Sequence, residues 1–520
     1  MHCILDAMPP VLSKSRILSA RQCPKRLWLE VNEPSLAEQS GTSRAILSTG
    51  VSIGELARKV LAPGGVLIEG PSAQAAEKTS QLLSAPNVTL HEATFGASQV
   101  FVRSDLLWQH DGQLSVAEVK SGSKVKPYHI EDCAIQYWVL REAGYPPETF
   151  SLAHINTGFV LSDDGSGADD ETNNDTDQQR YAGLFTLSDI TPDIAALQTE
   201  IPKWIRHADN VLANDRPDIA TGAQCKKPHA CPFISHCQSS EPQITFPIAQ
   251  YPGLKPKTRA QLFDHGFQDI RDVPATEASA ILELQEPAAL SRWQAASQGK
   301  EWLSDALLPT LRELPFPRYF LDFESIAFAV PKWPGSKPFE QFPFQFSIHV
   351  QTGDDSTLEH REFLDLSGAP PLRMLAESLI RALDSSGPVV VYTSFERTCI
   401  NGLARRLPDL ADPLQAINER LFDLYAVLKK HYYHPAQNGS YSIKKILPVV
   451  LEPGDADYSS LHGVSDGLAA QLAYTDAIAL AENSEEKQRL NTELLDYCGL
   501  DTLALYKVMQ RLLQPRLENH

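Results

Sequence analysis

Residues 318–325 read RYFLDFES and set the interpretation of the second half of the chain. The aromatic and branched side chains from Tyr319 to Phe323 favour a β-strand. Successive side chains of a strand point to opposite faces, so Asp322 and Glu324, which are two residues apart, share one face. The strand therefore presents two carboxylates side by side.

Two later motifs each add an acid. VVVYTSFERTCINGLARR, residues 389–406, is typical of a strand that runs into a helix. It places Glu396 at the carboxyl end of that strand, where α/β folds assemble their sites. TELLDYCGLDTLALYKVM, residues 492–509, has the apolar periodicity of a helix. Tyr497 and Asp501 lie four residues apart on it, and hence on one face.

The elements between these motifs complete an α/β pattern. PFQFSIHV, residues 343–350, predicts a second strand, and residues 372–383 predict a helix. The order strand, strand, helix, strand, helix is typical of an α/β domain. We expect this domain to cover residues 311–520.

The order of these motifs resembles the DEDD exonucleases of the RNase H-like fold, in their Tyr-containing subgroup, over residues 315–515. In that family four acids bind two metal ions, and the tyrosine positions the attacking water. The implied ligands of Mg²⁺ or Mn²⁺ are Asp322, Glu324, Glu396 and Asp501. The resemblance makes Tyr497 the catalytic orienter of a 3′-5′ exonuclease-like centre. In one place the chain departs from the family, because Glu396 stands where the family has Asp.

Two neighbouring segments belong to the same comparison. Asp423 in RLFDLYAVL is an alternative ligand to Glu396, although an acid on a helix surface gives the same pattern. SYSIKKIL, which contains Ser442 and Lys444, is similar to a segment between the second and third exonuclease motifs. A serine that caps a helix explains the same residues.

A hairpin in the first half of the chain carries another set of charges. QVFVRSDLLWQHDGQLSVAEVKSG, residues 99–122, predicts two strands joined at an Asp-Gly turn. Glu118 and Lys120 share a face of one strand, and Asp105 lies on the other strand. The two acids can hold Mg²⁺ or Mn²⁺, and the lysine can orient or deprotonate a water molecule. A surface hairpin with exposed cross-strand charges is the alternative interpretation.

The cysteines are unevenly spread, with three of the eight in CKKPHACPFISHC. In a reducing compartment such crowding favours metal binding over disulfides. Together with the hairpin acids and SARQCPKRLWLE, it resembles the RecB-like branch of the PD-(D/E)XK nucleases over residues 12–240. In that branch one early and three late cysteines hold a 4Fe-4S cluster. The implied ligands are Cys23, Cys225, Cys231 and Cys237, with zinc as the alternative metal. Cys3 and Cys133 are expected to be incidental or core residues.

The resemblance to the RecB-like branch breaks at two positions. The branch carries Gln-x3-Tyr on the helix after the lysine strand, and here Gln136 is followed by Leu140 at the fourth place. Gln136 is a candidate contact to DNA or metal, or a polar residue of an amphipathic helix. The early metal-binding histidine of the branch is missing. Glu55 stands in the corresponding area as a candidate ligand, or as a solvated helix residue.

The middle of the chain is predicted to be a helical linker, residues 241–310, which follows an N-terminal nuclease domain at residues 1–240. Its segment AQYPGLKPKTRAQLFDHGFQDIRDVP resembles a helix-hairpin-helix unit. Such units grip phosphates through backbone amides and lysines. The candidate contacts are Lys255, Lys257 and Arg259. A plain helical linker accounts for the same pattern.

Composition limits the function classes. With 520 residues, 42% hydrophobic and 21% charged, the chain is long enough for two or three globular domains. No stretch reaches the roughly 18 apolar residues of a membrane span, so we expect a cytoplasmic protein without a membrane partner. The net charge of −19 argues against nucleic-acid binding. Seven acids in residues 162–179, a presumed solvated loop, and metal-binding carboxylates weaken that objection.

The two resemblances together predict an iron-sulfur nuclease with two catalytic centres. The pairing is similar to that of bacterial proteins of the domain of unknown function 2779 type. We expect a nuclease that processes DNA in repair, recombination or defence, with RNA as the other substrate of the C-terminal domain. The alternative is a scaffold that binds nucleic acid or a partner and in which one or both centres are inactive.

Overall fold

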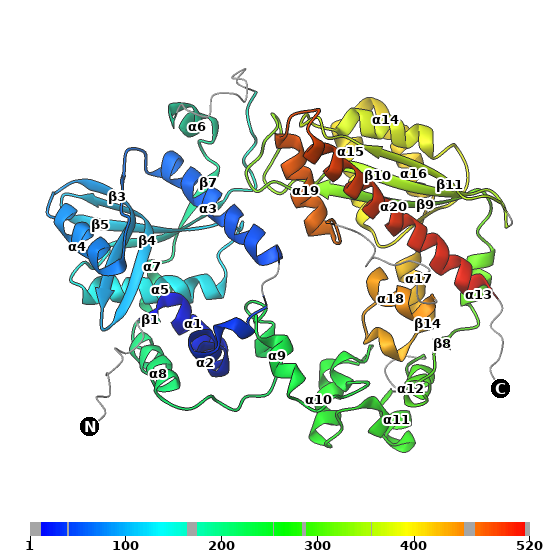
Figure 1. Ribbon diagram of the computed structural model, residues 1–520, viewed down its shortest axis with the longest axis horizontal. Coiled ribbons are helices and arrows are strands. Elements are labelled where there is room, and N and C mark those ends of the chain that lie inside the picture. The colour runs from blue at the N-terminus through cyan, green and yellow to red at the C-terminus, as the bar shows by residue number, and fades with distance from the viewer. Residues whose placement is uncertain are drawn as a thin grey trace. The chain divides into compact units, whose positions relative to one another are not determined.

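The structure, a computed structural model, describes residues 12–38, 41–163, 174–252, 254–282, 288–354, 356–451 and 463–514. It forms two compact units. The first unit comprises residues 1–241 and 328–340, and the second comprises residues 242–327 and 341–520. Each unit contains a β-sheet flanked by helices, so the predicted α/β class is confirmed (Figure 1).

The first unit is built on a seven-stranded sheet with the order β2-β3-β4-β5-β6-β7, in which β1 pairs with β4. Its strands are β1 (Leu12–Ser13), β2 (Val66–Leu67), β3 (Val88–Ala97), β4 (Val100–His110), β5 (Gln113–Lys120), β6 (Thr149–Ile155) and β7 (Phe185–Asp189). Strands β3, β4 and β5 are antiparallel, and β6 runs parallel to β5. The predicted hairpin is β4-β5. Its turn residues Asp111 and Gly112 both have positive φ, 47° and 81°, as a two-residue hairpin turn requires.

Helices pack on both faces of this sheet. The helices of the unit are α1 (Lys14–Gln22), α2 (Pro24–Asn32), α3 (Gly41–Leu61), α4 (Ser72–Leu82), α5 (Pro127–Glu142), α6 (Asn174–Arg180), α7 (Thr191–Ala195), α8 (Ile201–Ala213) and α9 (Ile234–Ser239). Leu107 of β4 packs in the core with residues of α5, whereas its neighbour Leu106 packs beside Leu61 of α3. Cys133 of α5 is fully buried in the first of these clusters, as expected of a core cysteine. Cys3 lies outside the described residues.

The acidic stretch of residues 162–179 differs in part from the predicted loop. Residues 164–173 lie outside the described part of the chain. From Asn174 the chain forms α6, so the end of the stretch is helical, and Asp177 pairs with Lys59 of α3 at 2.7 Å. The ion pair between the two helices gives this end of the stretch a fixed position.

The second unit contains a five-stranded sheet with the order β11-β10-β9-β12-β13. Its strands are β9 (Arg318–Ile326), β10 (Phe342–Gln351), β11 (Glu359–Leu364), β12 (Val389–Val391) and β13 (Leu421–Asp423). β10 is antiparallel to β9 and β11, while β9, β12 and β13 run parallel. This arrangement agrees with the expected RNase H-like fold. Strand β11 had not been anticipated from the sequence.

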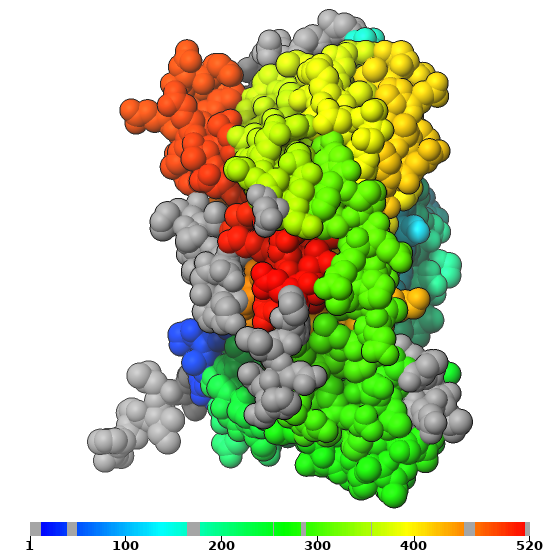
Figure 2. Space-filling model, turned by 90° about the vertical axis from the view of Figure 1, so that its right-hand side faces the viewer, coloured from blue at the N-terminus to red at the C-terminus, as the bar shows by residue number. Residues whose placement is uncertain are grey.

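Helices and a small ribbon complete the second unit. The helices are α10 (Pro256–Asp264), α11 (Ala275–Leu282), α12 (Ala289–Ser297), α13 (Leu307–Arg312), α14 (Leu372–Ala382), α15 (Phe395–Arg406), α16 (Ala411–Glu419), α17 (Leu424–His431), α18 (Ile443–Val450), α19 (Gly467–Ala479) and α20 (Glu485–Leu513). The ribbon pairs β8 (Trp302–Leu303) with β14 (Tyr432–Tyr433). Part of α20, red in Figure 2, is visible at the surface beside green residues of the segment that precedes β9.

Strand β9 has two different faces. Tyr319, Leu321 and Phe323 pack in a core with residues of α14 and α15. Phe320 packs on the other side, in a core that includes Leu505 of α20. Because side chains alternate along a strand, the acids at the even positions 322 and 324 lie on the side of α20.

The middle segment belongs to the second compact unit. It contains α10 to α13, so it is mostly helical, as predicted. Lys255 and Lys257 are exposed, and the Arg259 side chain donates a hydrogen bond to the Tyr251 carbonyl at 3.4 Å. Among the described helices, none is long and apolar enough to cross a membrane.

Candidate functional site

Three acids from two elements of the second unit converge on one point. Asp322 and Glu324 of β9 and Asp501 of α20 have carboxylate oxygens that all lie within 4.8 Å of one another. They line a cavity of about 290 Å³, to which Tyr392 and Lys444 also contribute. The alternation of β9 and the contact of α20 with this sheet bring the acids together, so regular secondary structure fixes the site.

Glu396 joins this group through Asp322. It lies in the first turn of α15, is 1% exposed and is hydrogen-bonded to the Asp322 side chain. This hydrogen bond raises the pKa of Asp322 and lowers that of Glu396. Oε2 of Glu396 is buried and has no hydrogen-bond partner. The Glu396 carboxyl group therefore points at the cluster.

The acids of this cluster are difficult to ionise together. Burial raises the pKa of Asp322 well above its usual value, and the charge of Asp501 raises it further. Burial and Asp501 also raise the pKa of Glu324 to about 8. Burial raises the pKa of Glu396 to about 8 as well. A divalent cation favours the ionised forms, so this donor set fits Mg²⁺ or Mn²⁺.

The Tyr497 hydroxyl lies at the edge of the cluster. Burial, followed by the nearby Asp501 carboxylate to which it is hydrogen-bonded, raises the pKa of Tyr497 above its usual range. The phenol is therefore protonated at neutral pH and acts as a hydrogen-bond donor. The ammonium group of Lys444 lies 5.7 Å from the centroid of the Tyr497 ring and adds positive charge to this side of the cavity.

Asp423 occupies a different position from the other acids. One of its oxygens accepts hydrogen bonds from the backbone N–H groups of Thr393 at 3.1 Å and Ala426 at 3.2 Å. The second bond caps α17, and the first ties the strand end before α15 to β13. The three-acid group does not include Asp423, although its charge contributes to the raised pKa of Glu396, after burial.

The hairpin residues of the first unit also meet. The Lys120 ammonium lies 2.8 Å from Glu118, and the Gln136 side chain donates to the other oxygen of Glu118 at 2.7 Å. Asp105 accepts a hydrogen bond from the backbone N–H of Val119 at 2.6 Å. The predicted trio and the candidate Gln136 thus occupy one buried region of the sheet.

The electrostatics of the two hairpin acids are opposite. Burial, and then the Glu118 charge, raise the pKa of Asp105 to about 8. Burial alone would raise the pKa of Glu118, but the Lys120 and Lys14 ammonium groups hold it below its usual range. Glu118 is therefore ionised at neutral pH, whereas Asp105 readily holds a proton. Asp105 and Glu118 therefore differ strongly in proton affinity, and a bound divalent cation would favour the ionised form of Asp105.

Two residues of this centre were missed in the sequence. Lys14 of α1 lies 2.7 Å from Glu118, and Asp132 of α5 accepts from Lys120 at 2.7 Å. Asp132 lies four residues before Gln136 on the same helix face, a spacing that was available as a signal. Lys14 carries no such signal, because it reaches Glu118 from a helix 104 residues away in sequence.

Glu55 is the outlying candidate of the first unit. It is exposed on α3, while Ile53 and Ala57 of the same helix are buried. The candidate ligand Glu118, by comparison, is only 3% exposed. Glu55 therefore does not share the buried position of the other candidate.

The four predicted cysteine ligands gather around one small cavity of the first unit. Cys23 separates α1 from α2, Cys225 lies in a 3₁₀ turn, and Cys237 lies in α9. The Cys231 backbone N–H donates to the Cys225 carbonyl at 2.8 Å. Burial raises the pKa of the Cys231 and Cys237 thiols.

Four thiolates are the donor set of a 4Fe-4S cluster and also of a structural zinc site, so the residues of this group fit either metal.

Comparison with known proteins concerns the second unit. Residues 319–442 match the family described as Domain of unknown function (DUF2779). This is the C-terminal domain type that the sequence resembled. The matched region includes β9, Glu396 and β13 but ends before α20, which supplies Tyr497 and Asp501. No curated protein matches the chain.

Proposed function

We propose that the second unit is a divalent-metal-dependent phosphodiesterase that trims nucleic acid from a 3′ end. The observation that carries this proposal is the convergence of Asp322, Glu324 and Asp501 oxygens within 4.8 Å. Buried carboxylates at this distance repel one another, which destabilises the fold unless protons or cations compensate. The buried Oε2 of Glu396, which has no hydrogen-bond partner, is a further site for a cation or a metal-bound water.

The side chains of the second unit have distinct roles in this proposal. Mg²⁺ or Mn²⁺ bound there would polarise the scissile phosphate and lower the pKa of a coordinated water. Asp322 has an oxygen within 4.8 Å of a Glu324 oxygen and is hydrogen-bonded to Glu396, so it is the acid that would contribute to both ions. Tyr497 stays protonated and orients the water by donating a hydrogen bond. Lys444 offers a positive charge to the phosphate.

We also propose a second nuclease centre in the first unit, of the RecB-like type, that acts on DNA. Asp105 and Glu118 would hold the metal, and the Lys120 ammonium, whose pKa the Glu118 and Asp132 carboxylates raise well above its usual value, would orient the water by donating a hydrogen bond. The burial of Glu118 beside Asp105 supports this assignment, because a solvated surface hairpin would leave both acids exposed. Gln136 orients Glu118 by its hydrogen bond to the other carboxylate oxygen.

A 4Fe-4S cluster is the cofactor we propose for the four thiols. It would join the start of the first unit, at Cys23, to its end, at Cys225 through Cys237. Without the cluster this end of the unit lacks a covalent connection, and we expect α1 and α2 to lose their attachment. Lys14 belongs to α1, so the cluster would also maintain one side of the Glu118 site.

One observation favours a second candidate function, the nucleic-acid or partner-binding scaffold. Glu118 already interacts with Lys14, Lys120 and Gln136, at 2.7, 2.8 and 2.7 Å. An acid so fully paired is typical of a structural ion pair. In that case the first unit would bind DNA without cutting it.

Paired variants and end-labelled substrates test the assignment. Anaerobically purified protein is incubated with Mn²⁺ and labelled single- or double-stranded DNA, and with RNA of the same sequence. We expect Asp501→Asn to stop stepwise trimming from the 3′ end and Glu118→Gln to stop a separate cleavage. A double variant that retains full activity would contradict both centres. A wild-type protein that binds all substrates and cuts none would establish the scaffold.

A further inference from the structure

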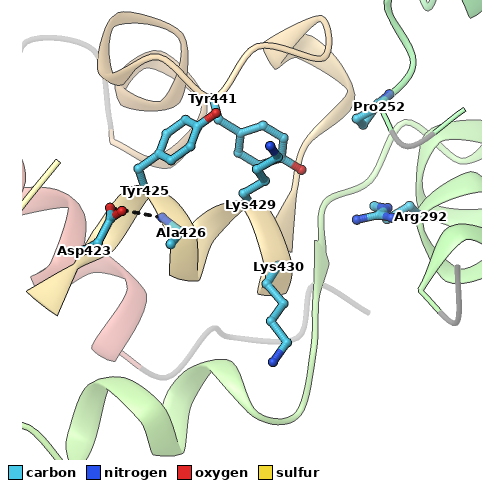
Figure 3. A pocket seen from close by; sticks show the side chains of 8 residues that line it. All are labelled: Pro252, Arg292, Asp423, Tyr425, Ala426, Lys429, Lys430 and Tyr441. Carbon is cyan, nitrogen blue, oxygen red and sulfur yellow. Dashed lines mark hydrogen bonds between the residues drawn. The ribbon is translucent and has the colours of Figure 1, made fainter. Parts of the chain in front are cut away.

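A second cavity of the second unit, of about 470 Å³, carries a positive lining. Its residues are Pro252, Arg292, Asp423, Tyr425, Ala426, Lys429, Lys430 and Tyr441. Figure 3 shows Tyr425, Lys429 and Lys430 rising from α17, with Arg292 and Pro252 on the opposite wall. Lys429 and Lys430 are exposed, and Tyr425 is half-buried. We refer to this space as the basic cavity.

The charge of the basic cavity contrasts with that of the chain. The whole protein carries −19, yet three cations and a single acid line this space. The acid is Asp423, and one of its oxygens is already held by the Thr393 and Ala426 backbone amides. Those amides and the start of α17 offset its negative charge. The cavity therefore suits an anion.

Aromatic rings form the rest of the wall. The Tyr425 ring lies 6.4 Å from that of Tyr441, and both line the basic cavity. The combination of phosphate-binding cations with tyrosine rings is the one that binds single-stranded nucleic acid, because bases stack on the rings while lysines follow the backbone. A volume of about 470 Å³ is sufficient for a nucleotide unit and too small for a duplex.

Two neighbouring tyrosines link the lining of the basic cavity to that of the acid cluster. Tyr392 lines the cavity of Asp322 and Asp501, and its ring lies 5.7 Å from that of Tyr425. The Tyr392 hydroxyl also donates to the Tyr441 carbonyl. A strand with its terminal phosphodiester at the acids would therefore pass Tyr392 before it reached Tyr425.

We propose that the basic cavity is a subsite for the single strand that leaves the acid cluster, with a base on Tyr425 and a phosphate at Lys429, Lys430 and Arg292. The proposal rests on the proposed function of the second unit and adds its substrate class. The enzyme would require several unpaired nucleotides at the end that it trims. Duplex ends would have to open before the strand enters.

Binding measured without cleavage tests the subsite. The full chain, in EDTA, is titrated against a fluorescein-labelled oligothymidylate and against a blunt duplex at several salt concentrations. We expect Lys429→Ala/Lys430→Ala to weaken single-strand binding and to reduce the slope of log K against log salt by about 1.4, or 0.7 for each phosphate contact. Tyr425→Ala should weaken binding roughly tenfold without changing that slope.

The control variant removes two positive charges elsewhere in the same unit. Lys300 and Arg312 are exposed and do not line the basic cavity, so Lys300→Ala/Arg312→Ala should leave affinity and slope nearly unchanged. If both double variants weaken binding equally, the effect is general electrostatics and the subsite is wrong. Thermal melting checks that Tyr425→Ala still folds. The variant Lys429→Ala/Lys430→Ala tests the subsite independently, because both lysines are exposed and their removal leaves the core unchanged.

The outcome separates the subsite from the catalytic proposal. A strand that binds through Lys429 and Lys430 but is never trimmed would contradict the proposed activity and leave the subsite intact. Trimming that proceeds at the wild-type rate and affinity in the lysine double variant would overturn the subsite alone. A photoreactive oligothymidylate should crosslink to the Tyr425 peptide, and crosslinks confined to the first unit would also overturn it.

Discussion

Asp322 of β9 and Glu396 in the first turn of α15 are hydrogen-bonded to each other through their carboxyl groups. Glu396 is 1% exposed, and its Oε2 atom has no hydrogen-bond partner. The helix that begins at Phe395 thus brings its first acid to the acids of β9.

Mn²⁺ should therefore stabilise the protein through the second unit. At about 100 times its Kd, a ligand that binds only the folded state contributes about 2.7 kcal/mol. We expect Asp322→Asn to lose most of this gain and Glu396→Gln to lose a smaller part, as measured by thermal unfolding with and without Mn²⁺. Asp476→Asn, a change of an exposed acid in α19, is the control. Equal Mn²⁺ stabilisation of all three variants would exclude a metal site at Asp322.

Lys120 should be more important than Lys14 for cleavage in the first unit. Both ammonium groups contact Glu118, but the proposed mechanism places the attacking water at Lys120 only. The Glu118 and Asp132 carboxylates raise the pKa of Lys120 well above its usual value, so its ammonium would orient the water and stabilise charge. Loss of one such donor costs about 10²–10³ in rate, so Lys120→Ala should lower the rate by at least about a hundredfold. Lys14→Ala should lower it less. The measurement is the initial rate of DNA cleavage at saturating Mn²⁺, and the reverse order would move the water-orienting role to Lys14.

These two centres show what sequence reasoning can and cannot reach. The strand alternation of Asp322 and Glu324 and the helical spacing of Tyr497 and Asp501 are local patterns, so they could be identified in the sequence. The contact between Asp322 and Glu396 depends on how α15 packs against β9, which no local pattern specifies. Lys14 reaches Glu118 by the same kind of tertiary packing.

The position of residues 328–340 has no local signal in the sequence, for a related reason. Residues 328–340 follow β9 and precede β10, yet they belong to the first compact unit. Their attachment uses backbone groups, since Gly335 donates to the Leu161 carbonyl at 2.7 Å and Leu161 donates to the Ser336 carbonyl at 3.0 Å. Backbone bonds of this kind do not depend on side-chain type, so composition carries no trace of them.

The thiol group should hold an iron-sulfur cluster that stabilises the first unit. Protein purified without oxygen should be brown and contain iron and acid-labile sulfide. Cys231→Ser should bleach it and lower its melting temperature, because it removes one ligand of four. Cys133→Ala is the matched control, since this buried thiol of α5 packs in a core cluster that contains none of the four predicted ligands. A colourless protein with one zinc ion per chain would refute the cluster.

His349 of β10 should make a stabilising contribution to the second unit that is lost as the pH falls, whereas the raised pKa values of Glu324 and Glu396 act in the opposite direction. The His349 ring stacks on His360 at 4.5 Å and shares a hydrogen bond with the Thr502 hydroxyl at 2.8 Å. Burial, and then the nearby His360, lower the pKa of His349 to about 4. In the unfolded chain a histidine titrates near 6.5. Between these values the unfolded state binds more protons, so the stabilising contribution is complete above about pH 6.5 and is lost as the pH falls towards 4.

The expected loss between pH 7 and pH 5 is on the order of 1 kcal/mol from this residue. The surrounding groups are Ser347 and Thr502, which are neutral, and His360, which lies 3.8 Å from Glu362. We expect the pH dependence of the urea midpoint of His349→Asn to differ from that of the wild type by the loss of this contribution, because asparagine keeps a polar contact to Thr502 but does not titrate. His265→Asn, at an exposed histidine of α10's C-terminal end, should leave the slope as in the wild type. If the midpoints of the His349 variant and the wild type change in parallel with pH, His349 makes no such contribution.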